Sequence, residues 1–138
     1  MAETSEKSIA AAIIVHGDRV LLVRRRITEG PFVWQFPVGE VGADETAEQA
    51  AVREALEETG LRTRAVSRLG RRAQPQTGTF LSYIACSVVS GEAHVAAPEE
   101  LSAIVWAAHA DIPRYVPYGL YPPVQAYLDA ELPHGAVS

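Results

Sequence analysis

GEVGADETAEQAAVREALEETGL, residues 39–61, contains the clearest helix pattern in the chain together with both of its end signals. Thr46 precedes the pattern and Gln49 follows three positions later, which is the spacing of a capping box that satisfies free backbone donors. Gly60 follows the last periodic residue, at a position where glycine adopts a left-handed backbone conformation easily. The stretch therefore predicts a helix over residues 46–59.

Three carboxylates are expected on one face of this helix. Glu54, Glu57 and Glu58 are three or four residues apart, and at about 100° per residue they project to the same side. Clustered carboxylates raise one another's pKa or require a cation, and oxygen ligands suit a hard ion such as magnesium. The alternative is an ordinary solvated acidic face, partly neutralised by Arg53. The opposite face, which we expect to pack on the core, holds Val52, Leu56 and Thr59.

The surrounding residues extend the helix pattern into a complete motif. Its order is G-x5-E-x7-R-E-U-x-E-E-x-G-U, where U is aliphatic, and it is filled by Gly39, Glu45, Arg53, Glu54, Ala55, Glu57, Glu58, Gly60 and Leu61. The motif resembles the Nudix box of the Nudix hydrolase (MutT-like) family. Residues 20–25, 34–37 and 100–106 also resemble segments outside the box, so the resemblance covers nearly the whole chain.

This resemblance implies an α+β fold, the α/β/α sandwich of the family with a mixed central sheet. Residues 1–138 would form a single Nudix hydrolase domain, with flexible termini over residues 1–7 and 133–138.

Apolar runs predict the other elements. Residues 9–15 and 20–23 flank the turn-forming residues 16–18 and predict a strand pair. Pro122 and Pro123 suit the first turn of a last helix that ends near Pro133. Further extended segments are expected over residues 36–41, 61–69, 80–89 and 99–106, and loops over residues 27–35 and 71–78. Strands with two separated helices also indicate an α+β domain.

The resemblance implies a metal-dependent hydrolase that cleaves a phosphoanhydride bond in a nucleoside diphosphate linked to another group. Magnesium, or alternatively manganese, would be held by the three helix glutamates named above, and the backbone carbonyl of Val38 or Gly39 would add a ligand. Arg53 would orient a neighbouring glutamate, and Glu45 would tie the loop to the helix. One departure is visible: many members carry two glycines after the proline, whereas this chain has Val38 and Gly39 after Pro37. A carbonyl ligand needs no side chain, so activity is not excluded.

The base that takes a proton from the attacking water differs among members of the family. Glu57, Glu99 and Glu100 are the candidates in this chain. We expect Glu100 to act as an auxiliary ligand or base, and the alternative is a solvated carboxylate on a loop.

Candidate substrate contacts come from aromatic and basic residues. Trp34, Phe36 and Tyr83 could stack a nucleobase, although aromatic residues beside strands are more often core. Arg24, Arg25 and Arg26 could meet phosphates, as could the arginines at residues 71–72, although solvated surface charge is the more common role.

Family signatures leave the substrate open. The tyrosine found after the box in dinucleoside polyphosphate hydrolases is absent, because Thr77, Gly78 and Thr79 occupy that window. The NADH-type motif is absent too, and Pro75 lies near the proline of ADP-ribose hydrolases. The small chain resembles triphosphatases, so we expect a (deoxy)nucleoside triphosphate, unmodified or oxidised. The alternatives are ADP-ribose or a nucleotide sugar, an RNA 5′ end, and a nucleotide sensor without turnover.

Composition limits partners and compartment. A chain of 138 residues with 48% hydrophobic residues has the size and core of one domain. Its net charge of -5 argues against an extended nucleic-acid surface, which needs many cations. The single cysteine, Cys86, excludes an internal disulfide and is expected to be a buried core thiol. The apolar run over residues 9–15 is too short for a secretory signal or a membrane span, which predicts a cytoplasmic protein. Homodimers are common in the family.

Overall fold

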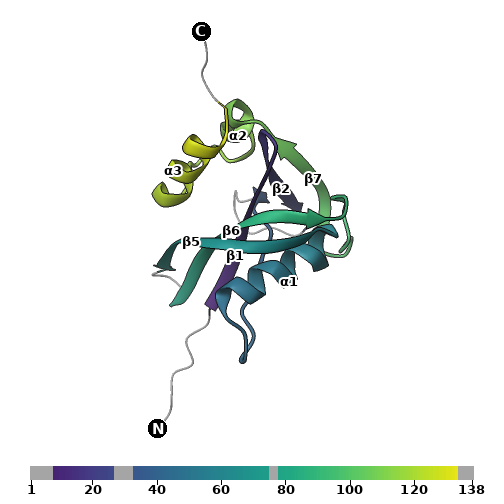
Figure 1. Ribbon diagram of the computed structural model, residues 1–138, viewed down its shortest axis with the longest axis vertical. Helices are drawn as coiled ribbons and strands as arrows, with labels where there is room; N and C mark the ends of the chain where they lie inside the picture. The colour runs from purple at the N-terminus through teal and green to yellow at the C-terminus, as the bar shows by residue number, and fades with distance from the viewer. Residues whose placement is uncertain (1–7, 27–32, 75–77, 134–138) are drawn as a thin grey trace.

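The computed structural model describes residues 8–26, 33–74 and 78–133, in which a mixed sheet lies between helices (Figure 1). Within these ranges the sheet has seven strands in the order β3-β2-β1-β6-β5, with β4 paired to β1 and β7 paired to β2. The strands are β1 (Ser8–His16), β2 (Arg19–Arg25), β3 (Trp34–Gln35), β4 (Val38–Glu40), β5 (Arg62–Gln74), β6 (Thr79–Ser90) and β7 (Leu101–Ala107). The helical segments are α1 (Ala47–Thr59), η1 (His109–Asp111), α2 (Ile112–Tyr115) and α3 (Pro122–Glu131).

The central strand β1 contributes to hydrophobic cores on both faces of the sheet. Ala11 and Ile13 pack in the cluster that contains residues of α3, whereas Ala10, Ala12 and Ile14 pack with α1. Side chains alternate between the faces of a strand, so a strand that is covered on both sides needs apolar residues at successive positions. The two helices cover opposite faces (Figure 1), which confirms the predicted α/β/α sandwich with a mixed sheet.

The predicted strand pair on either side of the turn at residues 16–18 is confirmed. Val15 lies opposite Val20 in an antiparallel register, and Gly17 adopts a φ of 63° in the turn between them. β1 also pairs in parallel with β6 and in antiparallel register with β4. This pairing places β4, which contains the first glycine of the motif, beside the central strand.

Several boundaries differ from the predictions. Trp34 and Gln35 form strand β3 against β2, instead of ending a loop. The loop predicted from Arg71 is wrong at its start, because β5 continues to Gln74 and pairs with β6 along its length. Arginines are tolerated there because β5 lies at the edge of the sheet. The last strand begins at Leu101, after a turn, and the short helical segments over residues 109–115 were not predicted.

The predicted caps of α1 are confirmed. The Thr46 hydroxyl accepts a hydrogen bond from the Gln49 backbone N–H at 3.0 Å, and the Gln49 side chain accepts one from the Thr46 N–H at 2.9 Å. Gly60 ends the helix with a φ of 78°.

The predicted packing face of α1 is only partly right. Thr59 is buried as expected, but Leu56 is 38% exposed and Val52 is only half-buried. Small residues instead form the contact with the sheet, and they are Ala50, Ala51 and Ala55. Alanines let the helix approach the sheet closely, and the resulting rotation buries Glu58, which was expected on the outer face.

The remaining predictions about the core and the chain ends have mixed outcomes. The last helix forms as predicted, and Cys86 is a buried thiol whose pKa burial raises to about 11. No helix among the described residues is long and apolar enough to span a membrane. The predictions for residues 1–7 and 134–138, for most of the loop over residues 27–35, and for Pro75 and Thr77 lie outside the described residues.

Candidate functional site

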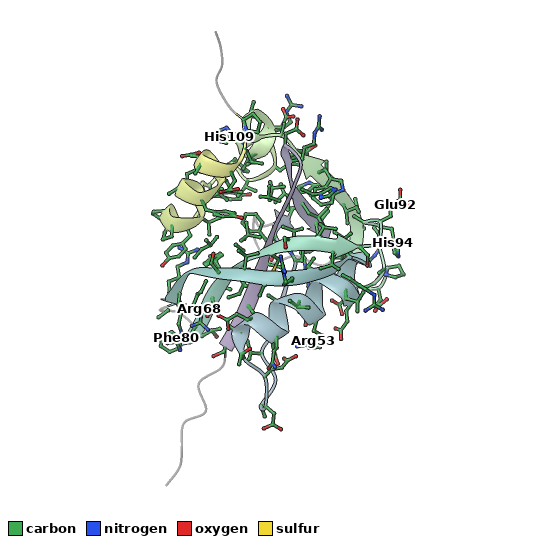
Figure 2. All side chains as sticks on the ribbon, viewed as in Figure 1. Arg53, Arg68, Phe80, Glu92, His94 and His109 are labelled. Atoms are coloured by element: carbon green, nitrogen blue, oxygen red, sulfur yellow. The ribbon has the colours of Figure 1, made fainter. Side chains whose placement is uncertain are left out.

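Arg53 on α1 connects the helix to the loop that precedes it (Figure 2). Its Nε and Nη2 donate to the two carboxylate oxygens of Glu45 at 2.6 and 2.9 Å, and Nη2 also donates to the Glu40 carbonyl at 2.9 Å. Its Nη1 donates to Glu54 at 2.9 Å and to Glu57 at 3.3 Å. A planar guanidinium with several fixed donors can hold carboxylates in set positions. Arg53 therefore fixes Glu54 relative to the loop.

Glu45 joins the loop before α1 to Arg53 on the helix. The carboxylate accepts a hydrogen bond from the Gly42 N–H at 2.9 Å in addition to those from Arg53. Hydrogen bonds from Arg53 and Gly42 lower the pKa of Glu45 from 4.5 to about 2. Glu45 thus joins loop and helix, as the resemblance implied.

Acid is expected to destabilise the protein through Glu45. Because its pKa is about 2 in the folded chain and 4.5 without its partners, its contribution is complete above about pH 4.5. The contribution is lost as the pH falls from 4.5 toward 2. Urea unfolding across this range should show a steeper loss of stability for the wild-type protein than for Glu45→Gln. Parallel pH profiles of the two proteins would contradict this role.

Glu54 packs against Gly39 of β4. The side chain of Glu54 is only 13% exposed. A Cβ atom placed on Gly39 would lie 2.1 Å from both Cδ and Oε2 of Glu54, so only glycine leaves room for this carboxylate. The motif's first glycine therefore has a steric role, which the sequence did not reveal.

Glu58 is the buried carboxylate of the site. It is 2% exposed, and its Oε1 accepts a hydrogen bond from Arg25 Nη1 at 3.3 Å. Its Oε2 has no hydrogen-bond partner among the residues that the structure describes. Burial raises the pKa of Glu58 to about 8, with a further increase from Glu54, against the opposing effect of Arg25. A buried carboxylate oxygen without a partner is costly unless a cation or donor meets it.

Arg25 links Glu58 to the proposed auxiliary acid. Its Nη2 lies 3.7 Å from Glu100 Oε1, on the opposite side from the contact with Glu58. Strands β2 and β7 pair so that Arg25 lies opposite Leu101, which brings the neighbouring Glu100 to the arginine that already contacts Glu58 of α1. Sequence reasoning grouped Arg25 with phosphate-binding arginines and missed this role, because the strand pairing joins segments far apart in the chain.

The loop that carries Glu100 is attached to the C-terminal end of α1. The backbone N–H groups of His94 and Ala96 donate to the carbonyls of Thr59 and Glu58, each at 2.9 Å. Figure 2 shows His94 at this end of the helix, and a Cβ on Gly60 would lie 2.2 Å from its Cε1. The free carbonyls of the helix end thus hold the loop in place.

The helix glutamates do not converge on one point. Glu57 is 56% exposed and contacts Arg53, whereas Glu54 and Glu58 turn toward the sheet. Among residues 8–26, 33–74 and 78–133, no group of three or more His, Cys, Asp or Glu side chains is placed to hold a metal ion. Glu54 and Glu58 lie close enough to affect each other's charge, whereas Glu57 is drawn away by its contact with Arg53.

The predicted arginine contacts differ in their surroundings. Arg24 is exposed on β2. Arg26 donates through Nε to the Pro98 carbonyl at 2.8 Å and through Nη2 to the Leu101 carbonyl at 3.5 Å. Arg26 therefore holds the loop before β7, a role that sequence reasoning did not assign to it.

A cavity of about 340 Å³ is lined by two of the aromatic residues that were predicted to stack a nucleobase, Phe36 and Tyr83. Its lining comes from β1, β3, β4, β5 and β6 and comprises Ala11, Gln35, Phe36, Val38, Arg72, Leu81 and Tyr83. Phe36 and Tyr83 also belong to the core. Trp34 lies outside the lining and meets the Tyr115 ring edge-on at 5.0 Å, so the structure places it with the core. Two successive residues of β4 thus have different neighbours, because Val38 lines the cavity and Gly39 contacts Glu54.

Known proteins share both the sequence pattern and the fold. A family model described as NUDIX domain matches residues 6–127. The chain is 29% identical over 104 residues to a Bacillus subtilis protein named "Putative 8-oxo-dGTP diphosphatase", a match that covers 75% of this chain and 67% of that protein. It is 40% identical over 53 residues to Phosphatase NudJ of Escherichia coli K12, covering 38% of this chain and about a third, 35%, of that protein.

A solved structure agrees with the observed fold. The crystal structure of a NUDIX hydrolase from Nitrosomonas europaea matches with a TM-score of 0.77 at 21% identity, over 93% of this chain and 73% of that one. At this identity the match concerns the fold alone, whereas the family model covers most of the sequence. The chain therefore belongs to the Nudix family of pyrophosphohydrolases.

Proposed function

We propose that the protein hydrolyses a phosphoanhydride bond of a (deoxy)nucleoside triphosphate, unmodified or oxidised, with magnesium as cofactor. The observation that carries the proposal is the buried oxygen of Glu58 without a partner, beside Glu54 and the space that Gly39 leaves. The nearby cavity has a volume suited to a small ligand. The similarity to the Bacillus subtilis protein supports a triphosphate substrate.

The residues of the site fit a divalent metal ion. Oxygen ligands suit magnesium, and Glu58 Oε2 is buried and has no partner to satisfy it. Glu54 and Glu58 would hold the ion, and Glu57 would join them by turning away from Arg53. The carbonyl of Val38 or Gly39 would be a further ligand, and manganese could replace magnesium. When bound, the metal neutralises phosphate charge and lowers the pKa of a water molecule.

The protein's own groups position the reactants. Arg53 holds Glu54 through a hydrogen bond of 2.9 Å, so the carboxylate does not need to be ordered during the reaction. Glu100 is half-exposed beside Arg25, and we assign it to accept the proton of the attacking water. The cavity beside Val38 would hold the nucleobase, away from the charged groups.

Other substrates and a sensor role are the alternatives. ADP-ribose and nucleotide sugars share the diphosphate that the metal would grip. A sensor without turnover is disfavoured because it has no need for all of Glu54, Glu57 and Glu58, and this chain carries all three. A homodimer and a cytoplasmic location stay predictions from the sequence.

A substrate panel tests the proposal. Release of phosphate or pyrophosphate should be measured with nucleoside triphosphates, 8-oxo-dGTP, ADP-ribose, nucleotide sugars and dinucleoside polyphosphates, with magnesium and with a chelator. We expect magnesium-dependent turnover that is fastest with a triphosphate. Fastest turnover of ADP-ribose would replace the substrate assignment, and binding without product for every compound would identify a sensor.

A further inference from the structure

We infer that Arg72 makes the cavity selective for nucleobases that carry a 6-oxo group, such as guanine, over adenine. The inference rests on the proposed function, since it names the base of the same nucleotide substrate. It arises from the donors and acceptors that line the cavity.

Arg72 is held in place by two tyrosine rings. Its Nη2 donates to the Tyr83 hydroxyl at 3.0 Å, and its guanidinium lies 4.8 Å from the Tyr121 ring centre. The two rings stack on each other at 4.9 Å, and Tyr121 also donates to the Arg71 carbonyl. A Cβ on Gly70 would lie 2.8 Å from Tyr121 Cε2, so glycine admits this ring. The guanidinium is therefore fixed at the cavity wall.

The charge of Arg72 is not neutralised by an acid from the described residues. Within the described part of the chain, no carboxylate lies within ion-pair distance of it. Arginine has five N–H donors and no acceptor, and one contact with Tyr83 leaves most of them available. A ligand in this cavity should therefore offer acceptors to the guanidinium.

Tyr83 adds a second donor. Its oxygen accepts the hydrogen bond from Arg72, so its own proton can be donated to a ligand. Gln35, which also lines the cavity, carries both a donor and an acceptor, so it does not distinguish a base with a 6-oxo group from one with a 6-amino group. Guanine presents two acceptors, O6 and N7, to an arginine, whereas adenine presents an amino donor at position 6. An oxidised guanine keeps O6.

The other cavity walls favour a base over a phosphate. Ala11, Phe36, Val38 and Leu81 offer apolar surface, which suits a flat ring and would desolvate a phosphate. One of the acids that would hold the metal for the phosphates, Glu54, meets the next residue of β4, Gly39. β4 thus separates the cavity from Glu54 by a single residue step, so a base in the cavity would have its phosphates near this acid.

Binding of nucleoside monophosphates to the full-length protein tests the inference without turnover. Calorimetry with dGMP, dIMP and dAMP should show dGMP and dIMP binding about tenfold or more tightly than dAMP. The inosine nucleotide carries the 6-oxo group without the 2-amino group, so it isolates the contact in question. Arg72→Ala should lower dGMP affinity to the level of dAMP. Tyr83→Phe should lower it partly, because it keeps the ring and removes one donor.

Arg68→Ala is the matched control. Arg68 lies on the same strand, pairs with Glu48 and does not line the cavity, so dGMP binding should be unchanged. Equal binding of dGMP and dAMP by the wild-type protein would overturn the inference, even if triphosphates are hydrolysed. Equal losses for all three nucleotides in Arg72→Ala would also overturn it and indicate a phosphate contact. Base-selective binding without hydrolysis of any nucleotide would instead reject the proposed function.

Discussion

Replacing Glu57 by glutamine is expected to lower kcat by about a hundredfold or more, because the substitution removes a charged metal ligand and even the outer partners of such ligands are worth about 10- to 100-fold. The Glu57 side chain is 56% exposed, and its contact with Arg53 is the longest of that arginine's hydrogen bonds, at 3.3 Å. Arg53 keeps its hydrogen bonds to Glu45, Glu54 and the Glu40 carbonyl. Stability should therefore change little, because the substitution removes one exposed ion pair.

Glu48→Gln is the matched control for this variant. Glu48 lies in the first turn of the same helix, and its carboxylate pairs with Arg68 on β5. Loss of this pair should leave kcat and KM unchanged. Steady-state kinetics with magnesium, thermal unfolding and Mn²⁺ binding measured by electron paramagnetic resonance separate an effect on the site from an effect on folding. Wild-type turnover in Glu57→Gln would remove this residue from the proposed machinery.

The local signals of the sequence predicted α1 well. Thr46, Gln49 and Gly60 act within a few residues of one another, and their preferred contacts do not depend on the rest of the fold. The same holds for Gly17, whose turn joins neighbouring strands. Helix and hairpin boundaries of this kind can therefore be derived from short-range chemistry.

The environment of each acid could not be derived in this way. The spacing of Glu54 and Glu58 fixed their angles on the helix, but the alanine face of α1 decided which of them is buried. The contact of Arg25 with Glu100 depends on pairing between β2 and β7, and its contact with Glu58 depends on how α1 packs on the sheet. Periodicity describes one element, whereas burial and ion pairing depend on how elements meet.

The cavity shows the same limit. Phe36 and Tyr83 were candidates from residue type alone, and the structure places them in both core and cavity lining. Arg72 lines the cavity because it lies on β5, which continues to Gln74. The sequence prediction placed Arg72 in a loop, so its position beside the cavity was not expected. Edge strands accept charged residues that interior strands exclude, which weakens the sequence pattern for strands at such positions.

Gly39→Ala is expected to lower kcat by about a hundredfold while the protein stays folded, because a displacement of about 1 Å of a catalytic group has costs of that size. The new methyl carbon would lie 2.1 Å from Glu54 Cδ. The clashing atoms are at the end of a flexible side chain, so Glu54 can move away, and the movement takes its carboxylate from the site. Mn²⁺ affinity should fall together with kcat. Gly42→Ala is the control, since the atom nearest to its Cβ would be Glu45 Oε1, at 3.3 Å, and Glu54 would not be displaced.

A double-mutant cycle identifies the cause of that loss. If Gly39 acts by leaving space for the Glu54 carboxylate, then Gly39→Ala should cost little further activity in a Glu54→Ala background. If the glycine is needed for backbone conformation alone, the two losses should multiply, because Gly39 pairs with Ala10 across β4 and β1 whatever residue 54 is. Multiplying losses would therefore contradict the steric role. A combined loss much smaller than the product of the two single losses would show that Gly39 acts through Glu54.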